Sequence, residues 1–243
     1  MVESIYEQLK DAALRLSEDC NRGASRILRH KSVAHVINPL DYAWAYHEQF
    51  LDKWSGFGAK TLLLGMNPGP YGMAQTGVPF GATAMARDIL KIEERQIVTP
   101  EGAHPKRPIE GLSMERQEVS GTRFWSMLSD HYGSTEAIFS NIFVVNHCPL
   151  LILAETGRNV TPVDLPKSII EPVLKACDQH LESVVNIMGI DSLVGVGNYA
   201  KKRAQSVLND VDIDAMWHPS PASPLANRNG GADWRANAIS KIP

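Results

Sequence analysis

Two asparagines and one histidine follow separate apolar runs of the chain and could share a reaction site. Asn67 comes just after residues 61–64, Asn146 ends a second apolar run, and His218 opens the short segment 218–221. An amide is not a base at neutral pH, but its oxygen can hold a water molecule by accepting a hydrogen bond. This arrangement suits a reaction whose bond breaks largely before the nucleophile arrives. A histidine can stabilise the charge that develops on the leaving group.

The same residues could recognise a planar ring. The amide of Asn146 presents a donor and an acceptor side by side, which complements a base edge with a carbonyl next to an N–H, as in uracil. Phe80 could stack on such a ring. We therefore expect Asn67, Asn146 and His218 to line one pocket that accepts a planar base.

The segment 65–73 joins three glycines and two prolines directly to an apolar run. Glycine lets the backbone turn sharply and approach a ligand closely, and Pro68 and Pro70 stiffen the loop. This composition predicts a rigid pocket wall at the carboxyl end of a parallel strand, where open α/β sheets bind ligands. A tight strand-to-helix turn without any chemistry would look the same.

Four apolar runs predict strands, and amphipathic segments between them predict helices. The strands are expected at 61–64, 138–145, 193–196 and 213–217, and the helices at 3–19, 39–54, 83–90, 121–132, 164–188 and 230–242. A further helix is expected after Asn198, and it contains Lys201, Lys202 and Arg203. Residues 20–37 and 93–120 are expected to be irregular. Strands that alternate with helices indicate an α/β fold with a parallel sheet covered on both faces, and we expect one domain over 1–243.

Composition excludes several classes of protein. With 44% hydrophobic and 21% charged residues, the 243-residue chain is typical of a globular protein, and its net charge of −3 disfavours bulk electrostatic coating of duplex nucleic acid. Three distant cysteines, without a Cys-x-x-Cys pair, disfavour an iron–sulfur cluster or structural zinc. Without an acidic cluster we expect no divalent metal, and we also expect no cofactor. No signal peptide or membrane span is visible, so we expect a cytoplasmic protein, used at the nucleoid if the cell is bacterial. We also expect a monomer.

The turn at 195–200 leaves two interpretations open. It fits G-x-G-x-x-A between a strand and a helix, with Asp212 and Asp214 at the distance expected of a ribose ligand, as in a nucleotide-binding oxidoreductase. Only one strand follows it, which is short for a dinucleotide fold. The same turn can hold a lone phosphate at a helix N-terminus. With Lys201 nearby, we favour contact of Gly197 and Lys201 with a nucleic-acid phosphate.

Two further alternatives belong to other classes of protein. Cys148, together with His218 and an asparagine, could form a cysteine hydrolase site, although a cysteine beside a strand end is more often a small buried hydrophobe. A single-strand DNA-binding module that has lost catalysis would carry the same ring-binding residues. The first alternative requires the thiol of Cys148, and the second predicts DNA binding without product.

Four segments together resemble one enzyme family. Residues 65–81, 118–125, 146–150 and 218–221 are similar, in this order, to motifs of the single-strand-selective monofunctional uracil-DNA glycosylases. The resemblance covers the chain from about residue 40 to its end. It implies a three-layer α/β/α sandwich on a four-stranded parallel sheet. It also implies excision of uracil, and of uracils altered at carbon 5 such as 5-hydroxymethyluracil, from single- and double-stranded DNA. The product would be an abasic site.

The resemblance also implies a role for each matching residue. Asn67 would place the water, His218 would stabilise negative charge at O2 of the departing uracil, and Asn146 would read the base edge. Gly69 stands where the commonest uracil-DNA glycosylases have a tyrosine, which leaves room at carbon 5. The expected substrate contacts are Gly65, Met66, Gly69, Tyr71, Met73, Phe80 and Asn146.

The loop after His218 is expected to fill the gap that a flipped nucleotide leaves in DNA. The expected DNA contacts are Gly197, Lys201, Pro219, Ser220, Pro221 and Ala222. Ala222 stands where the vertebrate members carry a long basic residue, so we expect weaker wedging into duplex DNA. The catalytic motifs contain no lysine that could form a Schiff base, which agrees with hydrolysis that leaves the DNA strand uncut.

Overall fold

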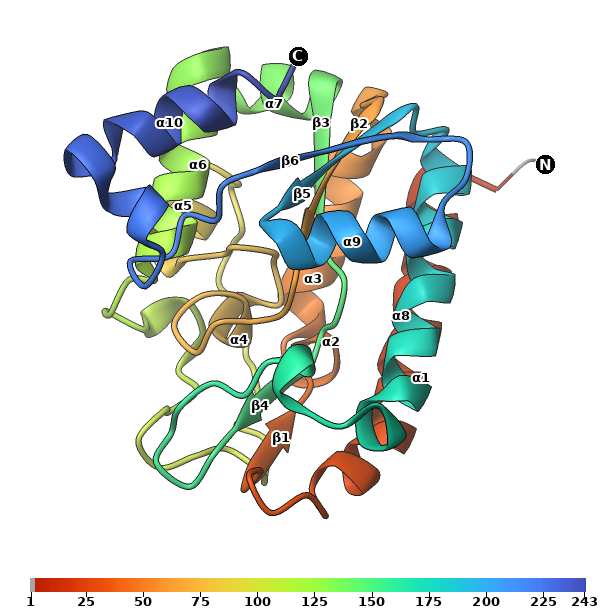
Figure 1. The fold of residues 1–243 in the computed structure, drawn as a ribbon, viewed down its shortest axis with the longest axis vertical. Coiled ribbons are helices and arrows are strands. Elements are labelled where there is room, and N and C mark those ends of the chain that lie inside the picture. Colours follow the sequence, from red (N-terminus) through yellow and green to blue (C-terminus); the bar gives the residue numbers. More distant parts are fainter. Residues whose placement is uncertain (1–2) are drawn as a thin grey trace.

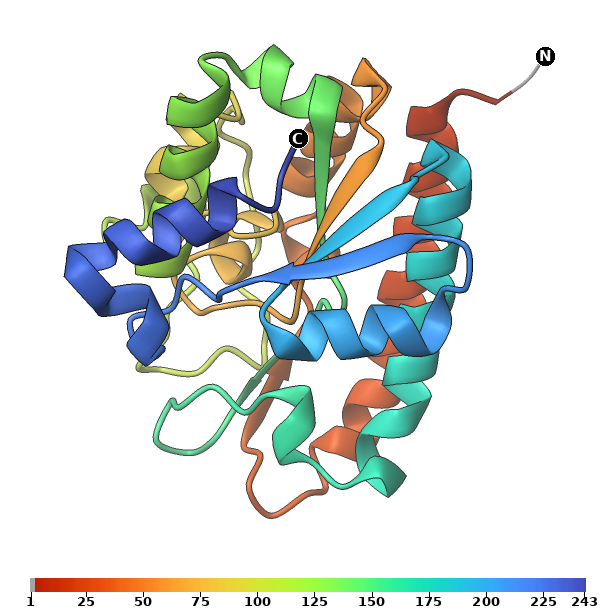
Figure 2. The same ribbon diagram turned by 45° about the horizontal axis from the view of Figure 1, so that its top comes forward.

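Four short parallel strands form the central sheet of the protein, which the computed structural model describes over residues 3–243 (Figure 1). Their spatial order is β3-β2-β5-β6, and Figure 2 shows them fanned side by side. The sheet strands are β2 (Thr61–Gly65), β3 (Ile142–Asn146), β5 (Ser192–Val196) and β6 (Asp212–Met216). The predicted α/β class and the four-stranded parallel sheet are confirmed.

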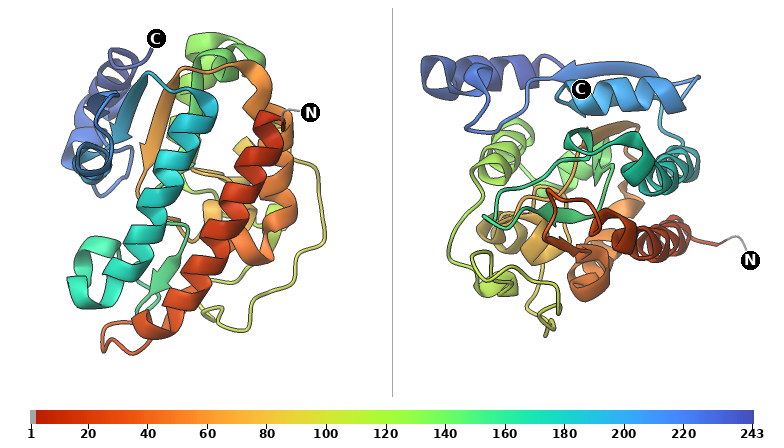
Figure 3. Two further views of the ribbon diagram at one scale, coloured as in Figure 1. Left: turned by 90° about the vertical axis from the view of Figure 1, so that its right-hand side faces the viewer. Right: turned by 60° about the horizontal axis from the view of Figure 1, so that its bottom comes forward.

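Helices cover both faces of this sheet. Successive side chains of a strand point to opposite faces, and Leu62, Leu63 and Leu64 of β2 are all 0% exposed. The longest helices, α1 and α8, run side by side along one side of the molecule (Figure 3). The helices are α1 (Ile5–Ile27), α2 (Pro39–Tyr42), α3 (Trp44–Trp54), α4 (Met73–Thr76), α5 (Thr83–Asp88), α6 (Val119–Tyr132), α7 (Thr135–Asn141), α8 (Lys167–Met188), α9 (Asn198–Val207) and α10 (Ala232–Ile239).

Helix α1 is longer than its sequence indicates. The sequence predicts an end at residue 19, but the helix continues to Ile27, and Cys20 and Ile27 extend its buried stripe. The expectation of irregular structure from residue 20 is therefore wrong for this part. Gly23 lies inside this helix where it faces α8, and a Cβ there would come within 2.3 Å of Val173 Cγ2. Its missing side chain lets the two helices approach closely.

The apolar run at 138–145 is divided between two elements. Its first part belongs to α7, which Ser134 caps by accepting a hydrogen bond from the Ala137 N–H, and strand β3 begins only at Ile142. The prediction of a strand from residue 138 is therefore wrong. Ile138 and Phe139 are buried by the helix as completely as a strand would bury them. Hydrophobicity alone does not distinguish the two cases.

Other element boundaries also differ from expectation. Helix α8 begins at Lys167 rather than at residue 164, and α10 covers less than the expected 230–242. The expected helix 39–54 is divided at Ala43 into α2 and α3. None of the helices within the described residues combines the length and apolar character that a bilayer crossing needs.

A second, two-stranded sheet lies beyond the carboxyl ends of the central strands. It pairs β1 (His35–Ile37) with β4 (Leu151–Leu153) in antiparallel orientation, and it was not predicted. Three-residue strands carry too little alternation to be recognised in a sequence. The chain leaving β4 turns back at an isolated bridge between Leu153 and Asn159, which carries Asn159 toward the edge of the central sheet.

Candidate active site

The segments that follow the four central strands are joined by backbone hydrogen bonds. Gly65 of β2 lies opposite Asn146 of β3, and the N–H of His147 donates to the Gly65 carbonyl over 3.0 Å. On the other side, the N–H of Gly197 donates to the carbonyl of Met216 over 2.9 Å. These bonds place the polar residues after β2, β3 and β6 at one edge of the sheet.

A cavity of about 480 Å³ opens at this edge, and it brings together most of the expected site residues. Asn67, Asn146 and His218 all line it, as the sequence predicted. The other expected residues on its wall are Met66, Gly69, Met73, Phe80, Ser220 and Ala222. Its volume lies in the usual range for a small-molecule binding site, which is roughly 300–1,000 Å³.

The Asn67 amide is held by a neighbouring asparagine. Its Nδ2 donates to the Pro68 carbonyl and to Asn159 Oδ1, both at 3.3 Å, and Asn159 Nδ2 donates to the Pro68 carbonyl over 2.9 Å. Within residues 3–243, no group donates to Oδ1 of Asn67. The amide therefore offers its oxygen to the cavity as a hydrogen-bond acceptor.

His218 is set up as a neutral donor. The backbone N–H of Ser220 donates to Nδ1 of His218 over 3.0 Å, which leaves the ring proton on Nε2. Burial lowers the pKa of His218 below its usual 6.5, because the charged ring would be poorly solvated there. The imidazole is therefore uncharged at neutral pH and can donate a hydrogen bond from Nε2.

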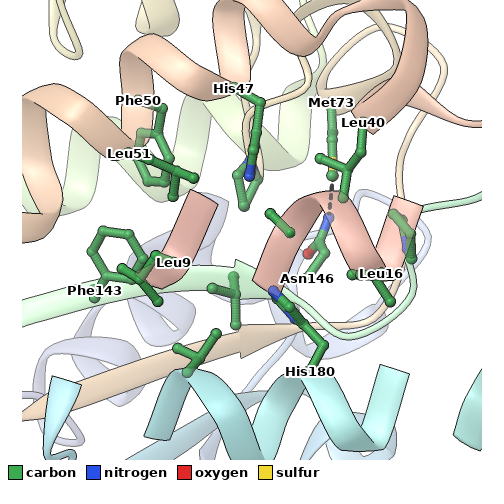
Figure 4. Close-up of a pocket in the computed structure, with 15 residues that line it drawn as sticks. Leu9, Leu16, Leu40, His47, Phe50, Leu51, Met73, Phe143, Asn146 and His180 are labelled. Carbon is green, nitrogen blue, oxygen red and sulfur yellow. Dashed lines mark hydrogen bonds between the residues drawn. The ribbon is translucent and has the colours of Figure 1, made fainter. Parts of the chain in front are cut away.

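The direction of the Asn146 amide is fixed by a sulfur atom. Its Nδ2 donates to Met73 Sδ over 3.1 Å, drawn as the dashed line in Figure 4. A thioether sulfur can only accept, so the donor end of the amide must face Met73. Gly65 allows this packing, because a Cβ there would lie 2.0 Å from Asn146 Oδ1. Asn146 thus presents its donor and acceptor in a defined order.

A second, small cavity lies behind Asn146. Its volume is about 20 Å³, space for one water molecule, and His47 and His180 reach it from opposite sides (Figure 4). His47 donates from Nδ1 to the Gly77 carbonyl over 2.8 Å, and burial lowers the pKa of His47 to about 4. Burial also lowers the pKa of His180, so the rear of Asn146 is enclosed by neutral groups.

Phe80 forms a rigid aromatic platform on the cavity wall. Its ring stacks on Phe124 of α6 with a centroid distance of 4.3 Å and an interplanar angle of 17°. Helix α6 comes this close because Gly121 has no side chain, since a Cβ there would lie 2.1 Å from the Phe80 carbonyl oxygen. The Phe80 ring centroid lies 6.5 Å from that of His218, so an aromatic face and a polar ring line the same cavity.

Some expected contact residues lie outside the cavity wall. Tyr71 points to Arg107 and Arg116, whose guanidinium groups lie 5.3 and 4.2 Å from its ring centroid. Pro219 is buried beneath the loop, whereas Pro221 is exposed at its surface. Tyr71, Pro219 and Pro221 therefore do not line the cavity.

Neither residue of the expected phosphate site lines the cavity, although Gly197 lies next to His218, where a Cβ on it would come within 3.4 Å of His218 Cβ. Lys201 Nζ is 3.3 Å from Asp214 Oδ1, and Lys241 Nζ is 2.7 Å from the other oxygen of the same carboxylate. Asp214 sits in the middle of β6 opposite Val194, so it is not placed at a strand end to bind a ribose. This geometry does not favour the dinucleotide interpretation.

The cysteine-hydrolase alternative finds no support. Cys148 is 0% exposed and does not line the cavity that contains His218, which removes the geometry of a cysteine hydrolase. Across residues 3–243, no group of three His, Cys, Asp or Glu side chains is arranged to hold a metal ion.

The cavity wall also contains polar residues to which the sequence assigned no role. They are Glu118, Ser120, Asn159, Thr161 and Ser223. Glu118 and Ser120 fall within the segment 118–125 that carried the family resemblance, which was a signal that could have been used. Asn159 had no such signal, because its position depends on the unpredicted strand β4.

Comparison with known proteins agrees with this site. The model of the uracil DNA glycosylase superfamily matches residues 53–238. The "Single-strand selective monofunctional uracil DNA glycosylase" of Bos taurus is 40% identical over 98% of this chain and 86% of its own length. The corresponding protein of Rattus norvegicus is 42% identical over 93% of this chain and 81% of its own length.

A solved structure supports the fold independently. The wild-type Pedobacter heparinus SMUG2 aligns with a TM-score of 0.63 over 93% of this chain and 95% of that one, at 17% sequence identity. This similarity concerns the fold alone. The matching family model and the two mammalian relatives show that the chain belongs to the single-strand-selective monofunctional family of the uracil-DNA glycosylase superfamily.

Proposed function

We propose that this protein is a monofunctional uracil-DNA glycosylase of base-excision repair. It hydrolyses the N-glycosidic bond of uracil in DNA, uses no metal or cofactor, and leaves an abasic site. The observation that supports this most directly is the meeting of Asn67, Asn146 and His218 in one cavity beside Phe80. These groups match the three tasks of the reaction, which are placing water, reading the base and stabilising the leaving group.

Base reading follows from the order of the Asn146 amide. The target nucleotide leaves the stack and its base lies against Phe80. Nδ2 of Asn146, directed by Met73, donates to uracil O4, and Oδ1 accepts from uracil N3–H. Cytosine presents an amino donor at position 4 and an unprotonated N3, so both contacts would become repulsive. The amide therefore selects uracil over cytosine.

Bond cleavage relies on charge stabilisation. As the bond between C1′ and N1 breaks, its electron pair moves into the base and negative charge builds up on O2. The Nε2–H of neutral His218 donates to this oxygen. A water held by Oδ1 of Asn67 then adds to C1′ of the sugar cation, and its proton passes to solvent. No side chain needs to act as a strong base.

The loop after His218 is the proposed DNA contact. Arg123 of α6 fixes it by donating to the carbonyls of Pro219 and Ala226, at 3.1 and 3.3 Å. Ala222 is exposed on this loop and also lines the cavity mouth. We propose that the loop enters the space left by the flipped nucleotide, in single- and double-stranded DNA, and that the enzyme acts as a monomer.

The test is a short labelled DNA with one uracil, incubated with the protein and chelator and then treated with alkali. A cut that appears only after alkali treatment is expected, on both single- and double-stranded substrates. A cut without alkali would contradict monofunctional chemistry. If the protein binds the DNA but no cut appears after alkali treatment, the inactive single-strand-binding module replaces the glycosylase.

A further inference from the structure

Two arginines meet on one tyrosine beside the cavity. Nη1 of Arg107 and Nη1 of Arg116 both donate to the hydroxyl oxygen of Tyr71, and both guanidinium groups also pack on its ring. We call these three residues the Tyr71 cluster. Tyr71 directly follows Pro70, which lines the cavity, so the cluster adjoins the cavity wall.

Arg107 is held in place by the loop that follows β4. Its Nε donates to the Gly157 carbonyl over 3.0 Å, and His104 Nε2 donates to the Glu155 carbonyl over 2.9 Å. The loop before α6 and the loop after β4 therefore lie side by side (Figure 1). Because the protein already orders the Arg107 side chain, a ligand that binds there does not have to immobilise it.

The Tyr71 cluster has unused donors and no anion. A tyrosine hydroxyl has two lone pairs and one proton. The two arginines occupy both lone pairs of Tyr71, and within residues 3–243 its proton has no acceptor. In the same part of the chain, the partners of the two guanidinium groups are this hydroxyl and backbone carbonyls, and none is a carboxylate. Two like charges held on one oxygen repel each other, and a bound anion would relieve that repulsion.

The overall charge of the protein means that it can attract DNA only through local groups of this kind. The chain carries a net charge of −3, so its average field repels a phosphate backbone. A guanidinium group matches the geometry of two phosphate oxygens, and a tyrosine hydroxyl adds a neutral donor. The Tyr71 cluster therefore has the composition of a phosphate site.

We infer that the Tyr71 cluster binds one backbone phosphate of the DNA strand that contains the uracil. The inference rests on the proposed function and adds a second DNA contact, separate from the loop after His218. Phosphate contacts position a protein on DNA without reading its sequence. A wedge needs a base stack on which to act, whereas a phosphate anchor does not, so this contact holds single strands as well as duplexes at the cavity.

The first test neutralises the phosphates one at a time. Single-stranded oligonucleotides carry one 2′-fluoroarabino-uridine, whose fluorine slows cleavage, and one uncharged methylphosphonate at successive positions around it. The affinity of the wild type should fall by about 10- to 100-fold at one position, the worth of a hydrogen bond to a charged group. Arg116→Gln should bind the unmodified strand more weakly and show a much smaller loss at that position. Equal losses in both proteins at every position would overturn the inference.

The second test separates a built site from a diffuse positive surface. Tyr71→Phe keeps the ring and both charges but removes the hydroxyl that holds the arginines, so the affinity for the same DNA should fall by about tenfold. An unchanged affinity would overturn the inference, because a diffuse surface does not need the hydroxyl.

The salt dependence of binding counts the phosphate contacts. In Arg116→Gln, the slope of log affinity against log salt concentration should become shallower by about 0.7, the value of one phosphate contact on a single strand. The matched control is Arg15→Gln, which removes the same charge from an exposed position on α1 outside the cavity wall and should bind like the wild type. Thermal unfolding of each variant checks that it is folded.

The outcomes separate the two proposals. If the wild type releases no uracil but loses affinity at one methylphosphonate position, and Arg116→Gln does not, the phosphate site stands and the glycosylase function falls. If uracil is released while the wild type and Arg116→Gln respond alike to every methylphosphonate, only the role of the Tyr71 cluster falls.

Discussion

The backbone N–H of Ser220 donates to Nδ1 of His218 over 3.0 Å. Both residues belong to one short segment, so the segment that carries the histidine also determines its tautomer. A protonated Nδ1 would face this N–H and lose the bond, which disfavours the imidazolium form. Burial acts in the same direction and lowers the pKa of His218. The leaving base therefore meets a neutral donor with its hydrogen on Nε2.

Replacing His218 by alanine should slow the chemical step. Removing one preorganised donor to developing charge typically lowers the rate by about 100- to 1,000-fold. We expect a loss of this size in single-turnover rates at saturating enzyme, with DNA affinity nearly unchanged. The exposed His131→Ala serves as the control and should be fully active. An unchanged rate in His218→Ala would exclude this residue from the mechanism.

Asn67 and Asn159 should act as a pair. Asn67→Ala removes the acceptor for water, so we expect a loss at least comparable to that of His218→Ala. Asn159→Ala leaves the acceptor in place but frees the Asn67 amide to rotate, and a loss of about tenfold is expected, the worth of one hydrogen bond. In the double variant, the Asn159 change should cost nothing further. Additive losses would contradict the positioning role.

Asn146→Asp should impair uracil excision by at least about tenfold, because a carboxylate cannot donate to uracil O4 and also loses its donor to Met73. Rates on uracil-containing DNA measure this, and the loss should persist at saturating enzyme. Asn141→Asp, on α7 just before the same strand, is a control outside the cavity. Wild-type activity of Asn146→Asp would refute the base-reading role.

The sequence predicted the centre of this site because strand ends can be recognised locally. The run Leu62–Leu64 reads as a buried strand, and chain topology then brings the loop after this strand next to Asn146 and His218. No side-chain detail is needed for that step. The residues that were correctly placed together are those that directly follow a central strand or lie in the loop after β2.

The remaining features depend on contacts between distant segments. Lys201 pairs with Asp214 of β6, and the Tyr71 hydroxyl accepts a hydrogen bond from Arg107. Asn159 reaches Asn67 only through strand β4. Glu118 becomes informative only when its carboxyl is found against Gly69. None of these contacts has a local sequence signal, although Glu118 itself lies in a segment that carried the family resemblance.

Leu225 should act as the wedge in place of a basic residue at position 222. It is 38% exposed on the segment Pro224–Gly231, which follows the cavity rim, and apolar side chains can part stacked bases. We expect Leu225→Ala to slow uracil excision from duplex DNA by about tenfold, a fraction of the few kcal/mol that flipping costs. Excision from single strands should stay within about twofold. Equal losses on both substrates would contradict the wedge role.

His47 should make stability depend on pH. It is 8% exposed, donates to the Gly77 carbonyl, and has a pKa lowered to about 4 by burial. Between pH 6.5 and 4 the unfolded chain binds a proton here that the folded chain does not, so stability falls as pH decreases. From about pH 7.5 to about pH 5 this residue alone should remove about 2 kcal/mol from the free energy of unfolding.

Urea unfolding of the wild type and of His47→Asn, at about pH 7.5 and about pH 5, isolates this contribution. Asparagine keeps a donor near the Gly77 carbonyl but does not titrate, so the variant should lose less stability than the wild type on acidification. Gln49→Asn, on the same helix α3, is a control that should destabilise the protein equally at both pH values. If His47→Asn keeps the full pH dependence of the wild type, His47 is not the buried group whose protonation destabilises the fold.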